Sequence, residues 1–319
     1  MTWHRRRSRL AGVVALGVGA ALLVGFGTPG RGFAQVTVID PPADEAPRLP
    51  ERFLSLLGRS AAVRYTSGSL DRAHHVLARL DAVASRLNRW TDFPVSSAVY
   101  VLDREQWSAA ELPGLYGIPL RLGPSAFAVP ALGDSGTVGL WRRVLDVETL
   151  PLVPGIPLRG TPEEAATLAL ADVLLQIECG RTLIERGELR PARPWIAELA
   201  AHAASLGAIA ALEPQRLDEV VATLVRVAQR LGGPGAYSLE EYSPQLLGGD
   251  EDQIRHWLWA QGAFAEGAAI LVARDGKGTV PRLHKLVRGQ GGLDAAVLAG
   301  RYPELDAWRS RYLAAPPAP

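Results

Sequence analysis

The stretch Ile177–Glu198 reads "IECGRTLIERGELRPARPWIAE" and joins two predicted helices through a turn rich in arginine and proline. We expect the first helix to begin at Thr161-Pro162-Glu163-Glu164, a capping box with proline at the first helical position. One face of that helix carries residues spaced four and three apart, namely Leu170, Leu174, Ile177, Arg181 and Ile184. Arg181 therefore interrupts an apolar stripe that should point inward.

A buried guanidinium requires a carboxylate partner, because an unpaired buried charge costs several kcal/mol. Glu198 on the following helix is the expected partner of Arg181. Glu178, three residues before Arg181, is the second expected partner. Alternatively, Arg181 pairs with Glu178 or Glu185 on an exposed helix surface, where such pairs contribute little to stability.

The first half of the chain mixes helical and strand patterns. The residues 70–90 carry apolar side chains at helical spacing, which predicts an amphipathic helix. We expect a strand over 93–102 and a short helix over 103–110. Two short β-type runs in 125–141 flank Gly133-Asp134 and predict a hairpin or a pair of edge strands. Pro130 indicates that the first run lies at an edge or ends there.

After residue 160 the sequence predicts helices almost throughout. We place them over 193–212, 214–231, 250–274 and 280–287, with more in the last thirty residues. The predicted fold class is α+β: a small N-terminal sheet with an amphipathic helix, then a mostly helical half. The expected segments are an export signal (1–34), a proline-rich spacer (35–50), an α/β subdomain (51–160) and a helical subdomain (161–319).

The N-terminal segment has the three parts of an export signal. "HRRRSR" is a positive start, 10–26 is uncharged and apolar, and Gly32 and Ala34 supply small residues before Gln35. We expect cleavage there and a secreted or extracytoplasmic location; the alternative is a retained N-terminal membrane anchor. No later segment is expected to be apolar enough to span a bilayer.

Charge and cysteine content limit the partners that we expect. The formal net charge of +1 falls to about −4 once the five arginines of 1–34 are removed, so no basic surface for nucleic acid is predicted. Membrane contact is expected only through the N-terminal segment, if it is uncleaved. Cys179 is the single cysteine, which excludes an intrachain disulfide.

These motifs resemble the peptidase MA-like gluzincins, a family of exported metallopeptidases and their relatives. Sequences of this family typically contain, in order, an apolar run, a His-Glu-x-x-His motif, a basic turn and a helix similar to "PxWxxEGLAxY". Here "VLLQIECGRTL" stands at the first motif and "RPWIAELAAH" at the second. The resemblance implies that Glu178 matches the general base and Glu198 the third metal ligand. Ile177 and Arg181 then occupy the two histidine positions.

Loss of both histidines decides the predicted activity. Two carboxylates lack the nitrogen donors of a catalytic zinc site, and a guanidinium repels a dication. We therefore predict a pseudoenzyme with a vestigial Glu178, no bound metal or cofactor, and an Arg181–Glu198 ion pair in the metal's place. Its cleft would bind a peptide or an envelope component, whose identity the sequence leaves open.

Two alternatives stay open. An active extracytoplasmic metallohydrolase could hold zinc through Glu178, Glu198 and His202, although a histidine in such a position is more commonly structural. A purely structural or interaction protein of the cell envelope is the third reading. We expect no chemistry from the adjacent His74 and His75, which a helix directs about 100° apart, or from His256 and Cys179.

Overall fold

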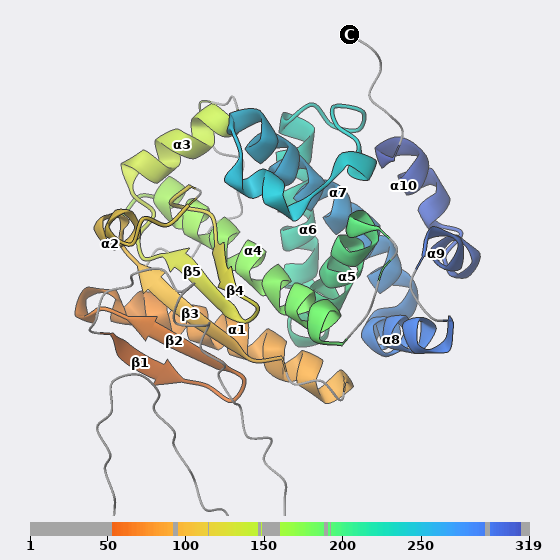
Figure 1. Ribbon diagram of the computed structural model, residues 1–319, viewed down its shortest axis with the longest axis horizontal. Coiled ribbons are helices and arrows are strands. Elements are labelled where there is room, and N and C mark those ends of the chain that lie inside the picture. Colours follow the sequence, from red (N-terminus) through yellow and green to blue (C-terminus); the bar gives the residue numbers. More distant parts are fainter. Residues whose placement is uncertain are drawn as a thin grey trace, which may run out of the picture. The chain divides into compact units, whose positions relative to one another are not determined.

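The computed structural model describes residues 53–91, 95–113, 115–145, 148, 160–187, 191, 193–290 and 294–313. They confirm the predicted α+β class, with a five-stranded mixed sheet and a helix followed by a mostly helical region (Figure 1). The described residues belong to one compact unit. The predicted export signal and spacer lie outside the described residues, and the proposed subdomain division at residue 160 stays a prediction.

The sheet has the strand order β1-β2-β3-β5-β4. Its strands are β1 (Leu54–Leu57), β2 (Ala61–Tyr65), β3 (Ser97–Leu102), β4 (Leu120–Gly123) and β5 (Ala126–Pro130). The three central strands run parallel, while β1 and β4 pair antiparallel at the two edges. Every residue of β3 and β5 is buried, as expected for strands covered on both faces.

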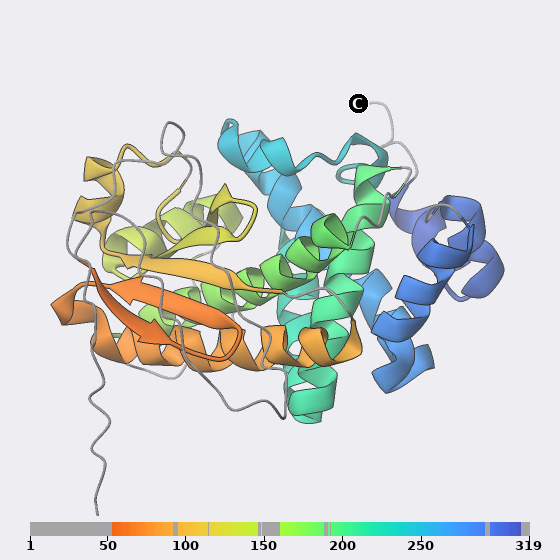
Figure 2. The ribbon, with the colours of Figure 1, turned by 60° about the horizontal axis from the view of Figure 1, so that its bottom comes forward.

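Helix α1 (Leu70–Trp90) has the predicted bounds and lies along one face of the sheet (Figure 2). Its buried stripe includes Val76, Leu80, Val83 and Leu87. Helix α2 (Arg104–Ala109) begins at a capping box and contributes Trp107 to a smaller apolar cluster with Tyr100 of β3. The sheet therefore has apolar cover on both faces.

The hairpin predicted over 125–141 is wrong in its second half. Strand β5 pairs with β4 and β3, and the residues after Gly133 form helix α3 (Ser135–Leu145). Asp134 accepts a hydrogen bond from the backbone N–H of Thr137 at 2.7 Å, which starts the helix. Burial of Val138, Trp141 and the last turn of α3 then outweighs the local strand preference. Pro130 ends β5, which is not an edge strand.

The C-terminal region is built from seven α-helices within the described residues. They are α4 (Pro162–Arg186), α5 (Pro194–Leu212), α6 (Pro214–Arg230), α7 (Glu251–Asp275), α8 (Thr279–Gln290), α9 (Ala295–Arg301) and α10 (Leu305–Tyr312). The predicted capping box is present, since Thr161 and Glu164 exchange side-chain-to-backbone hydrogen bonds. Helix α5 packs against α4, α6 and α7, and α1 packs against both α4 and α5.

Helix α5 corrects one expectation about membranes. By length and composition alone it could cross a bilayer, whereas the sequence reading allowed no such segment after the N-terminal one. In the fold, 78% of its apolar window is buried against the rest of the protein. Its apolar character thus serves helix packing in the core.

A buried ion pair ties α1 to α4. Both terminal nitrogens of Arg72 donate to the carboxylate of Asp172, at 2.9 and 2.6 Å, and His75 Nε2 lies 3.0 Å from the same carboxylate. Burial opposes ionisation of Asp172, but the Arg72 and His75 contacts lower its pKa to about 2. The Asp172 charge is therefore already neutralised within the core.

Candidate functional site

Close contact between α4 and α5 brings the acids of the quoted stretch together. A Cβ built on Gly180 would lie 2.0 Å from the carbonyl oxygen of Ala201, so only glycine permits this approach. The backbone N–H of Gly180 donates to Ser205 Oγ at 3.0 Å, and that hydroxyl donates to the Gln176 carbonyl at 2.9 Å. The two helices are thereby held at backbone-contact distance at the residue directly before Arg181.

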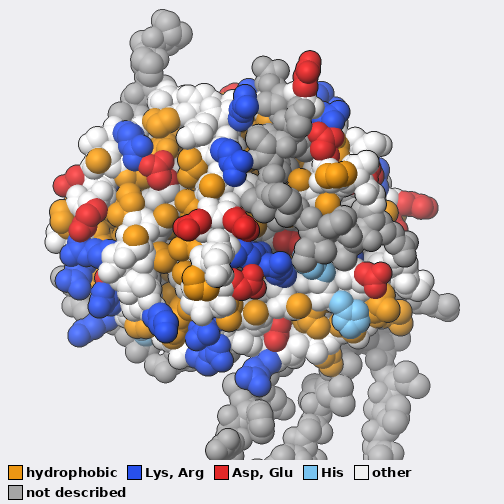
Figure 3. All heavy atoms as spheres, turned by 180° about the vertical axis from the view of Figure 1, so that it is seen from behind, with side chains coloured by type: hydrophobic (Ala, Val, Ile, Leu, Met, Phe, Trp, Pro, Cys, Tyr) orange, Lys and Arg blue, Asp and Glu red, His pale blue; other side chains and the backbone are white. Residues whose placement is uncertain are grey.

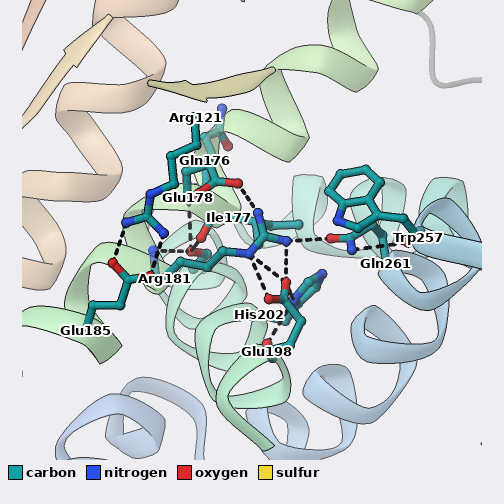
Figure 4. Close-up of polar contacts among 12 residues, drawn as sticks. Arg121, Gln176, Ile177, Glu178, Arg181, Glu185, Glu198, His202, Trp257 and Gln261 are labelled. Carbon is teal, nitrogen blue, oxygen red and sulfur yellow. Dashed lines mark hydrogen bonds and ion pairs between the residues drawn. The ribbon is translucent and has the colours of Figure 1, made fainter. Parts of the chain in front are cut away.

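The guanidinium of Arg181 lies between the two glutamates (Figure 4). Its Nε is 2.8 Å from each carboxylate oxygen of Glu198, and its Nη2 also donates to Glu198. Its Nη1 donates to Oε1 of Glu178. The side chains of Arg181, Glu178 and Glu198 are 11%, 10% and 4% exposed. The contacts of Arg181 are therefore buried, and the alternative of an ion pair on an exposed helix surface does not hold.

Helix α7 closes the third side of the cluster. The Arg181 Nη2 donates to Oε1 of Gln261 at 2.8 Å, and the Gln261 amide donates to the Trp257 carbonyl at 3.2 Å. The Arg181 Cζ lies 5.8 Å from the centre of the Trp257 ring. Sequence reasoning missed Gln261, although an amide within the apolar run WLWAQGAFA is a signal of a buried polar contact.

His202 supports Glu198 on another side. Its Nδ1 lies 3.0 Å from the Glu198 carbonyl oxygen and 3.2 Å from Oε1 of the same residue. Both neighbours are acceptors, so Nδ1 carries the proton. The ring is fully buried and packs 5.5 Å from Phe264. His202 therefore orients the carboxylate that Arg181 binds.

The two glutamates differ in their electrostatics. Burial raises the pKa of Glu178 above its ordinary value, although Arg181 and Arg121 act to lower it. Burial would also raise the pKa of Glu198, but the Arg181 charge and hydrogen bonds from His202 and Arg181 hold that pKa well below its usual range. Burial disfavours the charged form of Arg181, and the two carboxylates outweigh it, raising the Arg181 pKa. Glu198 and Arg181 thus stay an ion pair at neutral pH.

A cleft of about 370 Å³ opens over this cluster. Glu178, Arg181 and Glu198 form its charged base, and Trp257, Leu247 and Pro194 contribute apolar wall. Leu247 belongs to a short 3-10 turn, Pro244–Gly248, within the connection between α6 and α7. At the rim, Arg121 of edge strand β4 forms a bidentate ion pair with Glu185 of α4.

The remaining candidate residues have structural surroundings. Burial raises the pKa of the Cys179 thiol, which keeps it protonated. His256 stacks on Tyr237 with ring centres 4.6 Å apart, and its Nε2 lies 3.2 Å from the Ser238 carbonyl. Among the described residues, no group of three His, Cys, Asp or Glu side chains is arranged to hold a metal ion.

Comparisons of the chain with protein-family models, with curated proteins and with solved structures found no match.

Replacement Arg181→Gln should lower the free energy of unfolding by about 3–5 kcal/mol at pH 7.5, because it leaves two carboxylates buried without a cation. Without that cation the pKa values of Glu178 and Glu198 in the folded protein should both lie above the value of about 4.3 expected in the unfolded chain. A raised native pKa contributes stability that is present at low pH and lost as pH rises, so the deficit should shrink at pH 5. Urea unfolding at both pH values measures this.

Arg193→Gln is the matched control, because it removes the same charge from an exposed pair with Glu240 at 3.3 Å. It should cost less than about 1 kcal/mol at either pH. A deficit for Arg181→Gln as small as the control's, or one that is equal at the two pH values, contradicts the buried triad.

Proposed function

We propose that this chain is an exported, metallopeptidase-like protein without hydrolytic activity, whose cleft binds a peptide or an envelope component. One observation carries the proposal: the Arg181 guanidinium contacts both glutamates that would serve as general base and third metal ligand. A fixed organic cation thus stands where a gluzincin-type site would hold its metal.

The donor set around Arg181 does not fit zinc. Both oxygens of Glu198 accept hydrogen bonds from Arg181, and His202 contacts one of them. Ile177 is fully buried and offers no donor atom. A dication entering this space would have to displace a guanidinium whose positive charge is stabilised by two carboxylates. The same contacts occupy Glu198 and turn the His202 Nδ1 toward it, which counts against the Glu178, Glu198 and His202 ligand set.

The cleft supports a binding role. Its volume of about 370 Å³ falls within the range of about 300–1,000 Å³ that small ligands occupy. It combines the apolar surface of Trp257 and Leu247 with the charged pair Arg121–Glu185 at the rim. A peptide segment offers both apolar side chains and backbone polar groups, and so matches this lining better than a purely apolar ligand does.

We expect the purified chain to carry no stoichiometric zinc and to hydrolyse no peptide substrate. Ile177→His combined with Arg181→His would supply two imidazoles at i and i+4, with Glu198 as third ligand, and should create near-stoichiometric zinc binding. Adding Glu198→Gln to that pair should abolish it. Metal analysis after dialysis against zinc measures all three proteins.

An unmodified chain that purifies with near-stoichiometric zinc would contradict the proposal. So would chelator-sensitive hydrolysis that Glu178→Gln removes, since that result identifies an active metallohydrolase. A combined Ile177→His and Arg181→His protein that folds but takes up no zinc contradicts the assignment of these positions to the lost ligands.

Peptide binding is tested with a random-sequence peptide pool incubated with the full chain and recovered for mass spectrometry. Recovered peptides should bind the unmodified chain and lose at least about tenfold in affinity with Trp257→Ala or Leu247→Asp, because either change removes apolar wall. Trp90→Ala, at the end of α1 outside the cleft, should leave affinity unchanged. Equal binding by all variants, or no binding, contradicts a peptide cleft and favours an interface elsewhere.

A further inference from the structure

A second pocket, of about 190 Å³, lies where α1 meets the connection between α5 and α6. None of its lining residues belongs to the cleft over Arg181. Its walls combine two arginines, Arg79 of α1 and Arg216 of α6, with small and apolar side chains. The apolar members are Ala78, Ala82, Val83, Ile209 and Leu212.

The two guanidinium groups are close enough to affect each other. Burial lowers the pKa of Arg216, and the Arg79 charge lowers it further. Their side chains are 24% exposed for Arg79 and 17% exposed for Arg216, so solvent screens this repulsion only in part. Two like charges held this near each other at a cavity wall create a place for an anion.

Glu213 is the acid that contacts both arginines, and it holds each of them only at long range, with one long hydrogen bond from Arg79. Its carboxylate lies 3.5 Å from Arg79 and 3.8 Å from Arg216, beyond the about 2.7–2.9 Å of a charge-assisted hydrogen bond. The Glu213 side chain is 53% exposed and can turn into solvent. This residue also precedes α6, where its side chain makes no capping hydrogen bond.

The other charges near the pocket do not neutralise it. Asp172 acts on Arg216 at a distance, but its carboxylate is bound by Arg72 and His75. Glu219 is exposed on α6 and acts on Arg216 only weakly. Behind Arg216, the buried Gln176 accepts a hydrogen bond from Nη2 at 3.2 Å, which leaves the other terminal nitrogen toward Glu213 and the cavity. Two arginines against one loosely held glutamate leave an excess of one positive charge.

We propose that this pocket binds a small organic monoanion, with a carboxylate head between Arg79 and Arg216 and a short apolar tail against α1 and α5. The excess of one positive charge fits a single negative charge, and guanidinium groups bind carboxylates through paired hydrogen bonds. The tail follows from the alanine, valine, isoleucine and leucine walls. A volume of about 190 Å³, below the about 300 Å³ typical for drug-sized ligands, limits the tail to a few carbons.

Isothermal titration of the full chain with hexanoate tests the site, with 1-hexanol and inorganic phosphate as comparison ligands. Hexanoate should bind, and hexanol and phosphate should bind at least about tenfold more weakly, because each lacks one half of the recognised chemistry. Arg79→Gln and Arg216→Gln should each weaken hexanoate binding about tenfold or more. Glu213→Gln should strengthen it several-fold by removing the competing acid.

Arg226→Gln is the matched control, since this exposed arginine also lies on α6. Among the described residues, it donates a hydrogen bond only to the Ala222 carbonyl of that helix. It should leave hexanoate affinity unchanged. Thermal unfolding shows whether Arg216→Gln is folded, and Arg79→Gln tests the site independently. Absence of hexanoate binding, or affinity unchanged in both arginine variants, overturns the proposal. If phosphate binds as tightly as hexanoate, the proposed contact with an apolar tail is overturned. If hexanol binds as tightly as hexanoate, the proposed recognition of an anion is overturned.

Discussion

A guanidinium buried between two carboxylates is the constraint on which the helical region depends. Arg181 and Glu178 belong to α4, Glu198 to α5, and Gln261 to α7, so three packed helices share one polar cluster. Any displacement of α4 against α5 would leave a buried charge without its partner, at a cost of several kcal/mol. Gly180 makes the approach possible, because a side chain there would collide with the Ala201 carbonyl.

The same cluster separates structural from chemical roles in the cleft. A metal site needs open coordination positions and donors that are free to bind. Here the carboxylate of Glu198 already contacts Arg181 and His202, and these contacts fix the position of α5 against α4. The cleft keeps its apolar wall at Trp257 and its charged rim at Arg121, so apolar and polar surface remains beside the Arg181 cluster. The pocket at Arg79 and Arg216 shows the opposite balance, with two cations that share one loosely held acid, Glu213. On the face in Figure 3, basic and acidic side chains both occur among apolar ones.

Helix periodicity and capping carried most of what the sequence predicted. The bounds of α1, the start of α4 and the positions of α5 to α8 follow from apolar spacing and from signals such as Thr161-Pro162. Arg181 was recognisable because a charge interrupts a regular apolar stripe. The short strands β1, β2 and β4 have too few residues for a period to show. Helix α3 resembled a strand because its apolar face depends on tertiary burial, and Gln261 and the Arg79–Arg216 pocket depend on helix contacts that a linear pattern does not contain.

The most direct test of the central claim is a double-mutant cycle between Arg181 and Glu198, measured as free energies of unfolding. Arg181→Gln, Glu198→Gln and the combined variant isolate the coupling between the two side chains from their separate effects. We predict a favourable coupling of about 2–3 kcal/mol, because Arg181→Gln leaves the buried Glu198 carboxylate without its cation, and that carboxylate is absent from the combined variant. Single effects that simply add, giving a coupling near zero, would contradict it.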